Sequence, residues 1–380
     1  MRLEINNLES EKTEFDRPRP YFSMHKTEIS TLQKLENDFK NLVIIGNGGS
    51  ITSFRALLYA FRDEHDKNVE IITTMEPGYL KHVERTLDKE ETLIMPISKS
   101  GNTTGVIESA LFFLNKGYDI RPLTSKKGLI SQIAEKKSLE TLEHPDIGGR
   151  FTGLSETALA PAALLGLDVE EIFTEGRKAH EQYWEKQGES APGLLANALY
   201  NAEKKGFNEV LTPFYSTRLF GFYPLMVQLM HESVCKNGEG QTFYGDIGPE
   251  IQHHTNQRMF GGQKNVIPLI IESSHEHHTL NVEDELKDLK LRGRKFGSLD
   301  GQKLEDSLKA EASGVKKALE EENRPFIELK IEEISYGSIG RLMAFMQFLP
   351  VYSGWIRGVN PFNQPNVEKS KEYGFNQRFE

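Results

Sequence analysis

The 380-residue sequence has very little cysteine, no long apolar run and no excess of positive charge. Its one cysteine, Cys235, cannot form an internal disulfide, which excludes a disulfide-stapled domain and indicates a reducing compartment. No apolar run approaches the ~20 residues that a membrane-spanning helix needs, and Met1–Asn7 lacks a signal-peptide pattern. The net charge of −10 argues against broad electrostatic binding to nucleic acid or to an anionic membrane. We therefore expect a soluble, cytoplasmic protein without nucleic-acid or membrane partners.

Short apolar segments alternate with longer segments of helical spacing along most of the chain. The first alternation begins near residue 41 and a second begins near residue 209. The predicted strands are 41–45, 69–74, 91–97, 121–124, 209–215, 265–271 and 326–331. This alternation predicts an α/β protein with doubly wound parallel sheets. Pro213 lies inside one segment and predicts that this strand is short or at a sheet edge.

The stretch Ser98–Thr104, hereafter the serine turn, joins a predicted strand to a predicted helix and carries four hydroxyl groups around Gly101. A helix N-terminus offers unpaired N–H groups and the positive end of the helix dipole, and both favour an anion. Serine and threonine are also the usual residues of a plain helix cap. One cap needs only one hydroxyl, so we interpret the serine turn as a phosphate-binding turn.

A second strand-to-helix connection, Gly46–Ser50, contains three glycines and is hereafter the glycine turn. Glycine permits positive φ angles and a close approach of the backbone to a ligand. The glycine turn lacks the spacing of the dinucleotide-binding fingerprint. Because ligands bind at the carboxyl ends of parallel strands, both turns are expected at the ligand-binding edge of one sheet.

Three further features each have a functional and a structural explanation. The glycines of Gly148–Phe151 let the backbone bend so that Arg150 can point into a cleft, and the alternative is a surface salt bridge. Glu232 lies near the end of an apolar helix, where a carboxylate opposes the helix dipole, and the alternative is partial exposure. The run His275–His278 suits no standard set of metal ligands, so we expect a solvated loop and no metal.

Together these motifs resemble those of the glucose-6-phosphate isomerase family, and they occur in the order that the family has them. The resemblance covers about residues 40 to 375 and is weakest over 280–325. It rests on Gly46–Ser50, Ser98–Thr104, Gly148–Phe151, Gln228–Ser233, Gln252–His253, and Asn360–Pro365 through Lys371. It implies two sugar-isomerase (SIS) α/β domains in a three-layer α/β/α arrangement with a C-terminal helix. The expected division is an arm at 1–35, domains at 36–190 and 191–357, and a C-terminal turn and helix at 358–380.

The resemblance implies interconversion of glucose 6-phosphate and fructose 6-phosphate through a cis-enediolate, a step of glycolysis and gluconeogenesis. It implies Glu232 as the base that moves a proton between C2 and C1, and Arg150 as the group that stabilises the enediolate. His253 and Lys371 would assist ring opening, with His254 as a rival for His253. The residues implied to bind the sugar phosphate are Gly49, Ser50, Ser98, Lys99, Ser100, Thr103 and Gln228. Such chemistry needs no metal and no redox cofactor. The resemblance also implies a homodimer in which His253 enters the partner's site.

Two alternatives stay open at this point. The first is an isomerase that also acts on mannose 6-phosphate, because the sequence does not name the residue on the C2 side of the sugar. The second is a non-catalytic sugar-phosphate sensor, because the same α/β domain serves as a regulatory ligand-binding module. A sensor would need the two turns without the implied catalytic residues, and the N-terminal arm has no basic helix-turn-helix pattern. The presence of all four catalytic residues therefore favours the isomerase.

Overall fold

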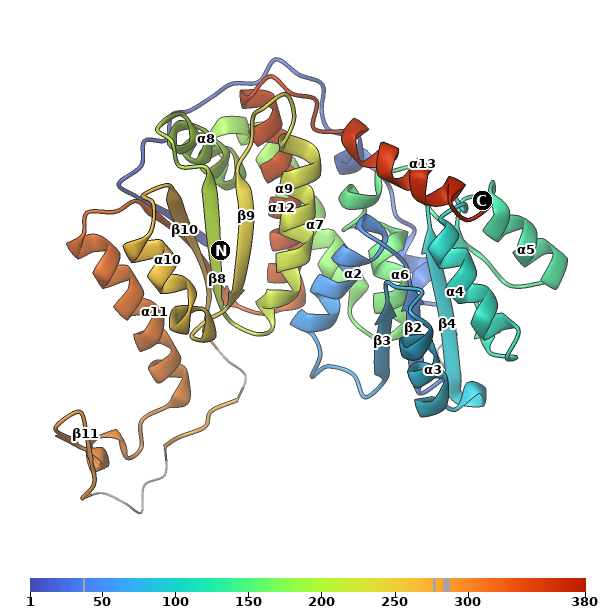
Figure 1. The fold of residues 1–380 in the computed structure, drawn as a ribbon, viewed down its shortest axis with the longest axis horizontal. Coiled ribbons are helices and arrows are strands. Elements are labelled where there is room, and N and C mark those ends of the chain that lie inside the picture. The colour runs from blue at the N-terminus through green and yellow to red at the C-terminus, as the bar shows by residue number, and fades with distance from the viewer. Residues whose placement is uncertain (37, 276–277, 283–287) are drawn as a thin grey trace.

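The structure, a computed structural model, describes residues 1–36, 38–275, 278–282 and 288–380. Two sheets lie side by side with a layer of helices between them (Figure 1). Further helices cover the outer face of each sheet, and a C-terminal helix follows the second sheet. The prediction of an α/β fold with two parallel-sheet units and a C-terminal helix is confirmed.

The first sheet is parallel throughout and has the strand order β3-β2-β4-β6-β7, with β5 also paired to β4. The strands are β2 (Asn41–Ile45), β3 (Asn68–Ile72), β4 (Thr92–Ser98), β5 (Asp119–Ile120), β6 (Leu123–Thr124) and β7 (Leu142–Glu143). Along β2, Leu42 and Ile44 belong to the core between the sheets, whereas Val43 and Ile45 belong to the outer core. Because both faces are covered, the strand is apolar at nearly every position.

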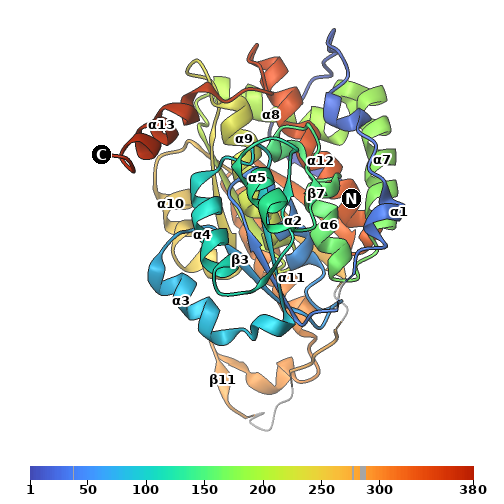
Figure 2. The same ribbon diagram turned by 90° about the vertical axis from the view of Figure 1, so that its right-hand side faces the viewer.

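Helices cover the outer face of the first sheet, where their apolar residues close a separate core. Figure 2 faces this side of the molecule. The helices are α3 (Pro77–Thr86), α4 (Thr104–Leu114) and α5 (Leu129–Lys137). Pro77 stands at the start of α3, where its missing N–H costs nothing. Both α4 and α5 follow turns at the carboxyl edge of the sheet, so the packing of this layer fixes where those turns lie.

The second sheet has the strand order β1-β13-β10-β8-β9 and is parallel except for β1, which runs antiparallel to β13. The strands are β1 (Arg2–Asn6), β8 (Glu209–Tyr215), β9 (Thr242–Ile247), β10 (Val266–His275) and β13 (Phe326–Glu333). Its outer face packs on α10 (Thr255–Gly261) and α11 (Leu304–Glu321). A small hairpin of β11 (Lys290–Leu291) and β12 (Arg294–Lys295) precedes α11. The N-terminal arm therefore contributes an edge strand to this sheet.

The prediction that Pro213 marks a short or edge strand is wrong. β8 is seven residues long and lies between β10 and β9. Its pairing with β10 runs from Glu209 to Leu211, skips Thr212 and Pro213, and resumes at Phe214. The missing proline N–H falls at that interruption in the ladder, so a central strand tolerates it.

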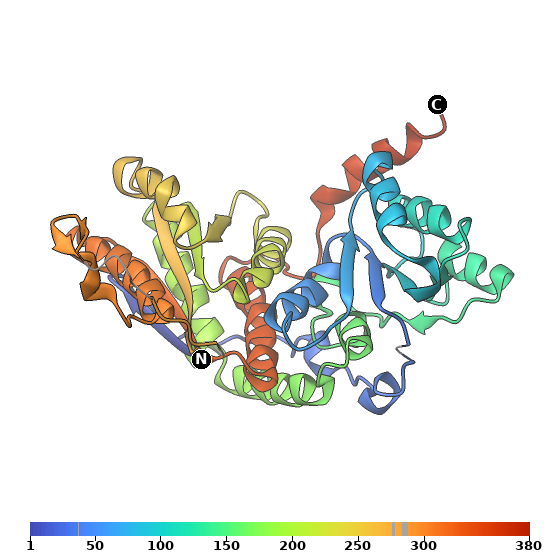
Figure 3. The same cartoon turned by 90° about the horizontal axis from the view of Figure 1, so that it is seen from below.

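The layer between the sheets buries the largest core of the protein. Figure 3 shows this layer from below, with one sheet on each side. Its helices are α2 (Gly49–Ala60), α6 (Glu156–Leu164), α7 (Val169–Lys186), α8 (Ala191–Lys204), α9 (Phe222–Val234) and α12 (Tyr336–Ile356). After α12 the chain turns and forms α13 (Glu368–Asn376), while the short α1 (Ile29–Leu32) belongs to the N-terminal arm. Within the described residues, no helix has both the length and the apolar character needed to cross a membrane.

Candidate active site

The glycine turn and the serine turn lie next to each other because they follow the adjacent parallel strands β2 and β4. The free N–H groups at the starts of α2 and α4 therefore meet at one edge of the sheet. Gly48 caps α2 with a φ of +57°, which favours glycine. Gly49 is needed for a different reason, since a Cβ there would lie 2.2 Å from the backbone nitrogen of Arg150. The glycine turn thus packs directly on the turn that carries Arg150.

Some side chains of the serine turn hold the turn in place, and others line a cavity. The hydroxyls of Ser98 and Thr103 lie 2.9 Å apart, and Ser98 is only 2% exposed, so Ser98 supports Thr103 from beneath. The Asn102 N–H donates to Ser100 Oγ over 3.1 Å. Lys99 forms an ion pair with Asp146 at 2.8 Å and lines a neighbouring groove. Ser100 and Thr103 are the predicted residues of this turn that line the cavity between the two turns and α13, and both also line the neighbouring groove.

A cavity of about 880 Å³ opens between the two turns and α13. α13 follows the turn after α12 and lies across the carboxyl edge of the first sheet (Figure 1). Residues from α9 and from the turn at Arg150 line the cavity as well. Of the predicted site residues, those that line it are Gly49, Ser50, Ser100, Thr103, Arg150, Gln228, Glu232 and Lys371.

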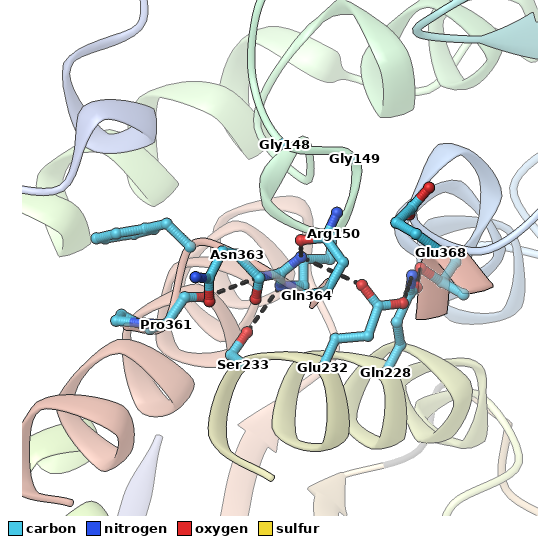
Figure 4. A network of polar contacts seen from close by, with 12 residues as sticks. Gly148, Gly149, Arg150, Gln228, Glu232, Ser233, Pro361, Asn363, Gln364 and Glu368 are labelled. Atoms are coloured by element: carbon cyan, nitrogen blue, oxygen red, sulfur yellow. Dashed lines mark hydrogen bonds and ion pairs between the residues drawn. The ribbon is translucent and has the colours of Figure 1, made fainter. Parts of the chain in front are cut away.

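Arg150 is 3% exposed and lies in a single 3-10 turn, η3 (Gly149–Phe151). Each of its five N–H donors has a partner (Figure 4). The acceptors are Ser233 Oγ for Nε (2.7 Å), Glu232 Oε2 (3.2 Å) and Gln364 Oε1 (2.8 Å) for Nη1, and the carbonyls of Pro361 (2.7 Å) and Asn363 (3.2 Å) for Nη2. Burial lowers the pKa of the guanidinium, and the Glu232 carboxylate acts against that shift. Arg150 therefore joins η3, α9 and the C-terminal turn through one buried cation.

The Glu232 carboxylate is held on both oxygens. Arg150 Nη1 donates to Oε2, and Gln228 Nε2 donates to Oε1 over 2.8 Å. Gln228 and Glu232 are four residues apart on α9, so they share one face of the helix. The Glu232 side chain is 26% exposed and lines the cavity. A carboxylate fixed in this way and open on one side is suited to receive and return a proton.

Lys371 projects from α13 on the opposite wall, where it pairs with Glu368 at 2.9 Å. His253 is placed differently. It lies exposed in η6 (Glu250–His253), and in the described part of the chain it does not contribute to the lining of the cavity. The neighbouring His254 contacts the Thr255 hydroxyl at 2.6 Å. One chain alone therefore brings together Glu232, Arg150 and Lys371 but not His253.

Of the histidine run at His275–His278, His275 ends β10, and neither His275 nor His278 is among the described residues that line the cavity. Glu276 and His277 lie outside the described residues. Elsewhere in the described ranges, no group of three or more histidine, cysteine, aspartate or glutamate side chains is placed to hold a metal ion.

The family model for phosphoglucose isomerase matches residues 33–376, which is most of the chain. The chain belongs to the phosphoglucose isomerase family. A protein of Thermus thermophilus named glucose-6-phosphate isomerase is 31% identical over 348 residues, covering 87% of this chain and 82% of the relative. A protein of the same name from Rubrobacter xylanophilus is 28% identical over 353 residues, covering 87% of this chain and 81% of the relative.

Solved structures agree with the phosphoglucose isomerase assignment at the level of the fold. A hypothetical protein of Thermus thermophilus superposes with a TM-score of 0.83 at 27% identity, covering 92% of this chain and 86% of that chain. A glucose-6-phosphate isomerase of Chlamydia trachomatis superposes with a TM-score of 0.76 at 23% identity, covering 91% of this chain and 71% of that chain.

Two further side chains of this phosphoglucose isomerase family member, the half-buried Gln364 and the buried Lys236, were not predicted as part of the site. Gln364 accepts from Arg150, and it belongs to the Asn360–Pro365 stretch that carries the family resemblance. Lys236 is 8% exposed and donates to the carbonyls of Ser233 and Asn360, both over 2.7 Å. Nothing in the local pattern around Lys236 indicates burial, because lysine is usually exposed. Lys236 thus connects the end of α9 to the C-terminal turn beside Arg150.

The burial of Lys236 predicts that its contribution to the stability of the fold depends on pH. Burial, together with the nearby Arg150 cation, lowers the pKa of its ammonium group from 10.5 to about 8. Between these two values the unfolded chain binds a proton that the folded chain does not, so the stability contributed by this group rises with pH. We expect the difference in melting temperature between the wild type and Lys236→Met to shift in favour of the wild type from pH 8 to pH 10. A difference in melting temperature that stays constant from pH 8 to pH 10 would contradict the lowered pKa of Lys236.

Proposed function

We propose that the protein catalyses the interconversion of glucose 6-phosphate and fructose 6-phosphate by proton transfer through a cis-enediolate. The observation that carries this proposal is the Glu232 carboxylate, held by Arg150 and Gln228 in a cavity that two helix N-termini also face. Relatives named glucose-6-phosphate isomerase, which align over most of their length, support the same reaction. Such an isomerisation needs a base, a group that stabilises enediolate charge and a binding site remote from the reacting carbons.

In this proposal the phosphate binds at the paired turns. Ser50, Ser100 and Thr103 offer hydroxyls, and the starts of α2 and α4 offer N–H groups and favourable dipoles. Ser98 acts by fixing the Thr103 hydroxyl. Lys99 adds positive charge from the neighbouring groove, although its ion pair with Asp146 partly offsets that charge. Phosphate binding far from the reacting carbons supplies orientation for the chemical step.

Glu232 then acts as the base that removes the C2 proton and returns it to C1. The negative charge that develops on the enediolate oxygens is stabilised by Arg150, whose guanidinium is already fixed by its other contacts. All five N–H donors of Arg150 already have acceptors. For Nη1 to donate a hydrogen bond to the enediolate, it must give up its hydrogen bond to either Glu232 or Gln364. Glu232 is one of the two acceptors that can be exchanged. Accepting the substrate proton weakens the hold of Glu232 on Nη1 at the moment when the enediolate needs a donor.

We also propose that Lys371 and His253 assist ring opening, with His253 supplied by the second subunit of a homodimer. Lys371 lies on α13 and lines the cavity, whereas His253 is exposed in η6 of the same chain. A site that lacks its histidine within one chain is completed when a symmetric partner presents the same exposed segment.

A homodimer with shared sites predicts that two inactive variants regain activity when their subunits form mixed dimers. Glu232→Gln and His253→Ala should each be nearly inactive alone, because each spoils both sites of its own dimer. After denaturation and refolding together in equal amounts, half of the dimers are hybrids with one intact site, so about a quarter of wild-type activity should return. No recovery, despite hybrid dimers detected by affinity tags, would contradict the shared site.

The proposed reaction is tested by adding fructose 6-phosphate to the purified protein and following glucose 6-phosphate by proton NMR. Conversion that saturates with substrate is expected, and mannose 6-phosphate tested in parallel defines the substrate range. Thermal stabilisation by fructose 6-phosphate without conversion would replace this proposal with a sugar-phosphate sensor. If fructose 6-phosphate is not converted and does not stabilise the protein, then the two turns do not bind a sugar phosphate.

A further inference from the structure

The side-chain amide of Gln228 lies between a hydroxyl of α2 and the carboxylate of α9. Thr52 Oγ1 donates to Gln228 Oε1 over 3.0 Å, and Gln228 Nε2 donates to Glu232 Oε1 over 2.8 Å. Thr52 is 7% exposed and is not among the described residues that line the cavity. The three side chains thus form a chain of hydrogen bonds that begins behind the cavity and ends on the carboxylate that faces it.

The direction of these hydrogen bonds follows from the chemistry of the three groups. An ionised carboxylate only accepts, so the amide NH₂ of Gln228 must face Glu232 and its carbonyl must face Thr52. A hydroxyl can donate or accept, and here it must donate. If the amide turned over, its carbonyl oxygen would face a carboxylate oxygen with no proton between them. The hydroxyl of Thr52 therefore favours the one amide orientation in which Glu232 receives a hydrogen bond.

The surroundings leave the amide little freedom to move elsewhere. Gly48 has a φ of +57°, and a Cβ at this position would lie 3.0 Å from Gln228 Nε2. The glycine turn therefore closes over the amide, and the Thr52 hydroxyl lies at its other end. On the far side of the carboxylate, Arg150 holds the second oxygen.

We propose that Thr52 is a positioning residue that sets the orientation of the Gln228 amide and, through it, the position of the Glu232 carboxylate. This inference rests on the proposed function, in which Glu232 is the base. Thr52 lies on α2, which begins at the proposed phosphate site, so one helix both receives the phosphate and orients the base on α9. Thr52 acts on the chemical step through Gln228 and does not touch the substrate.

The first test compares Thr52→Val with Thr52→Ser. Valine keeps the shape but removes the donor, so kcat should fall roughly three- to tenfold, the worth of one net hydrogen bond. KM should stay within about twofold, since Thr52 does not line the cavity, and serine should restore most of kcat. Thr157→Val is the matched control, because Thr157 is 1% exposed on α6 and its hydroxyl has no hydrogen-bond partner among the described residues. An unchanged kcat in Thr52→Val, or an equal loss in Thr52→Ser, would overturn the proposal.

The second test is a double-mutant cycle with Gln228→Met. If Thr52 acts only through Gln228, then Thr52→Val should cost nothing further in the Gln228→Met background. If the fold-losses in kcat of Thr52→Val and Gln228→Met multiply in the double variant, Thr52 does not act through Gln228.

The melting temperatures of the same four proteins give a readout that needs no activity. Their shifts should be non-additive by about 1–2 °C. If the wild type does not isomerise fructose 6-phosphate, the proposed function fails, while non-additive melting temperatures still support the Thr52–Gln228 link. Additive shifts would refute that link whatever the activity.

Discussion

Glu232→Gln should lower kcat by about 10³-fold, because general-base catalysis is typically worth about 10²- to 10⁴-fold. The amide has almost the same shape, but it cannot accept the C2 proton. It also offers only one acceptor where the carboxylate offers two, so either Arg150 or Gln228 loses its partner. Sugar-phosphate binding, measured by calorimetry, should change by less than about tenfold because the two turns are untouched.

A second carboxylate in the same cavity provides the control. Glu372 lies on α13 and lines the cavity, so Glu372→Gln makes the same chemical change at a position without a proposed role in proton transfer. Its kcat should stay within about threefold of the wild type. The assignment of Glu232 fails if Glu232→Gln keeps more than about a tenth of wild-type kcat, or if the two variants lose activity equally.

Arg150→Ala should damage both activity and stability. It leaves the Glu232 carboxylate, the Gln364 amide and two backbone carbonyls without their donor. Leaving a buried acceptor without its donor typically costs about 1–3 kcal/mol for each group. We expect kcat to fall by more than about 10³-fold, since the loss of one oxyanion donor alone costs about 10²- to 10³-fold. Denaturant titration and steady-state kinetics measure the two effects.

The matched variants for Arg150 separate charge from geometry. Arg150→Lys keeps a cation but has three donors for five acceptors and no planar fork, so it should recover stability only in part. Arg341→Ala removes a half-exposed arginine that pairs with Glu175, and it should change stability by less than about 1 kcal/mol. An Arg150→Ala variant as stable and as active as Arg341→Ala would refute the role of Arg150 as the buried link between three segments.

The sequence predicts the turns at the carboxyl edge of the first sheet because local chemistry determines them. A strand, a cluster of glycine or serine and an amphipathic helix follow one another at Gly46–Ser50 and at Ser98–Thr104, and each signal spans only a few residues. The two strands are adjacent in one parallel sheet, so their turns meet without further information. This part of the site needed no tertiary structure to be found.

Other elements depend on contacts that lie far apart in sequence. β9 contains glycine and aspartate, which are rare in strands. Gly245 is needed there because a Cβ would lie 2.2 Å from the Thr212 carbonyl oxygen on β8. β1 is a strand because β13 offers it an edge more than 300 residues away. Local patterns could not predict either pairing.

The residues that support the site were missed for the same reason. Lys236 appears as an ordinary lysine until the C-terminal turn brings the Asn360 carbonyl onto it. Thr52 lies in the first turn of a helix, where a hydroxyl needs no special explanation, and its role depends on Gln228, 176 residues later in the chain. Family resemblance indicates which groups react, whereas the structure is needed to see what orients them.

The most direct test of the proposed base is the isomerisation of fructose 6-phosphate in heavy water, followed by proton NMR. Transfer through an enediolate by Glu232 predicts that deuterium enters C2 of the glucose 6-phosphate product. It also predicts that Glu232→Gln abolishes both conversion and exchange. Isomerisation over many turnovers with no deuterium at C2, or exchange that persists in Glu232→Gln, would contradict the account.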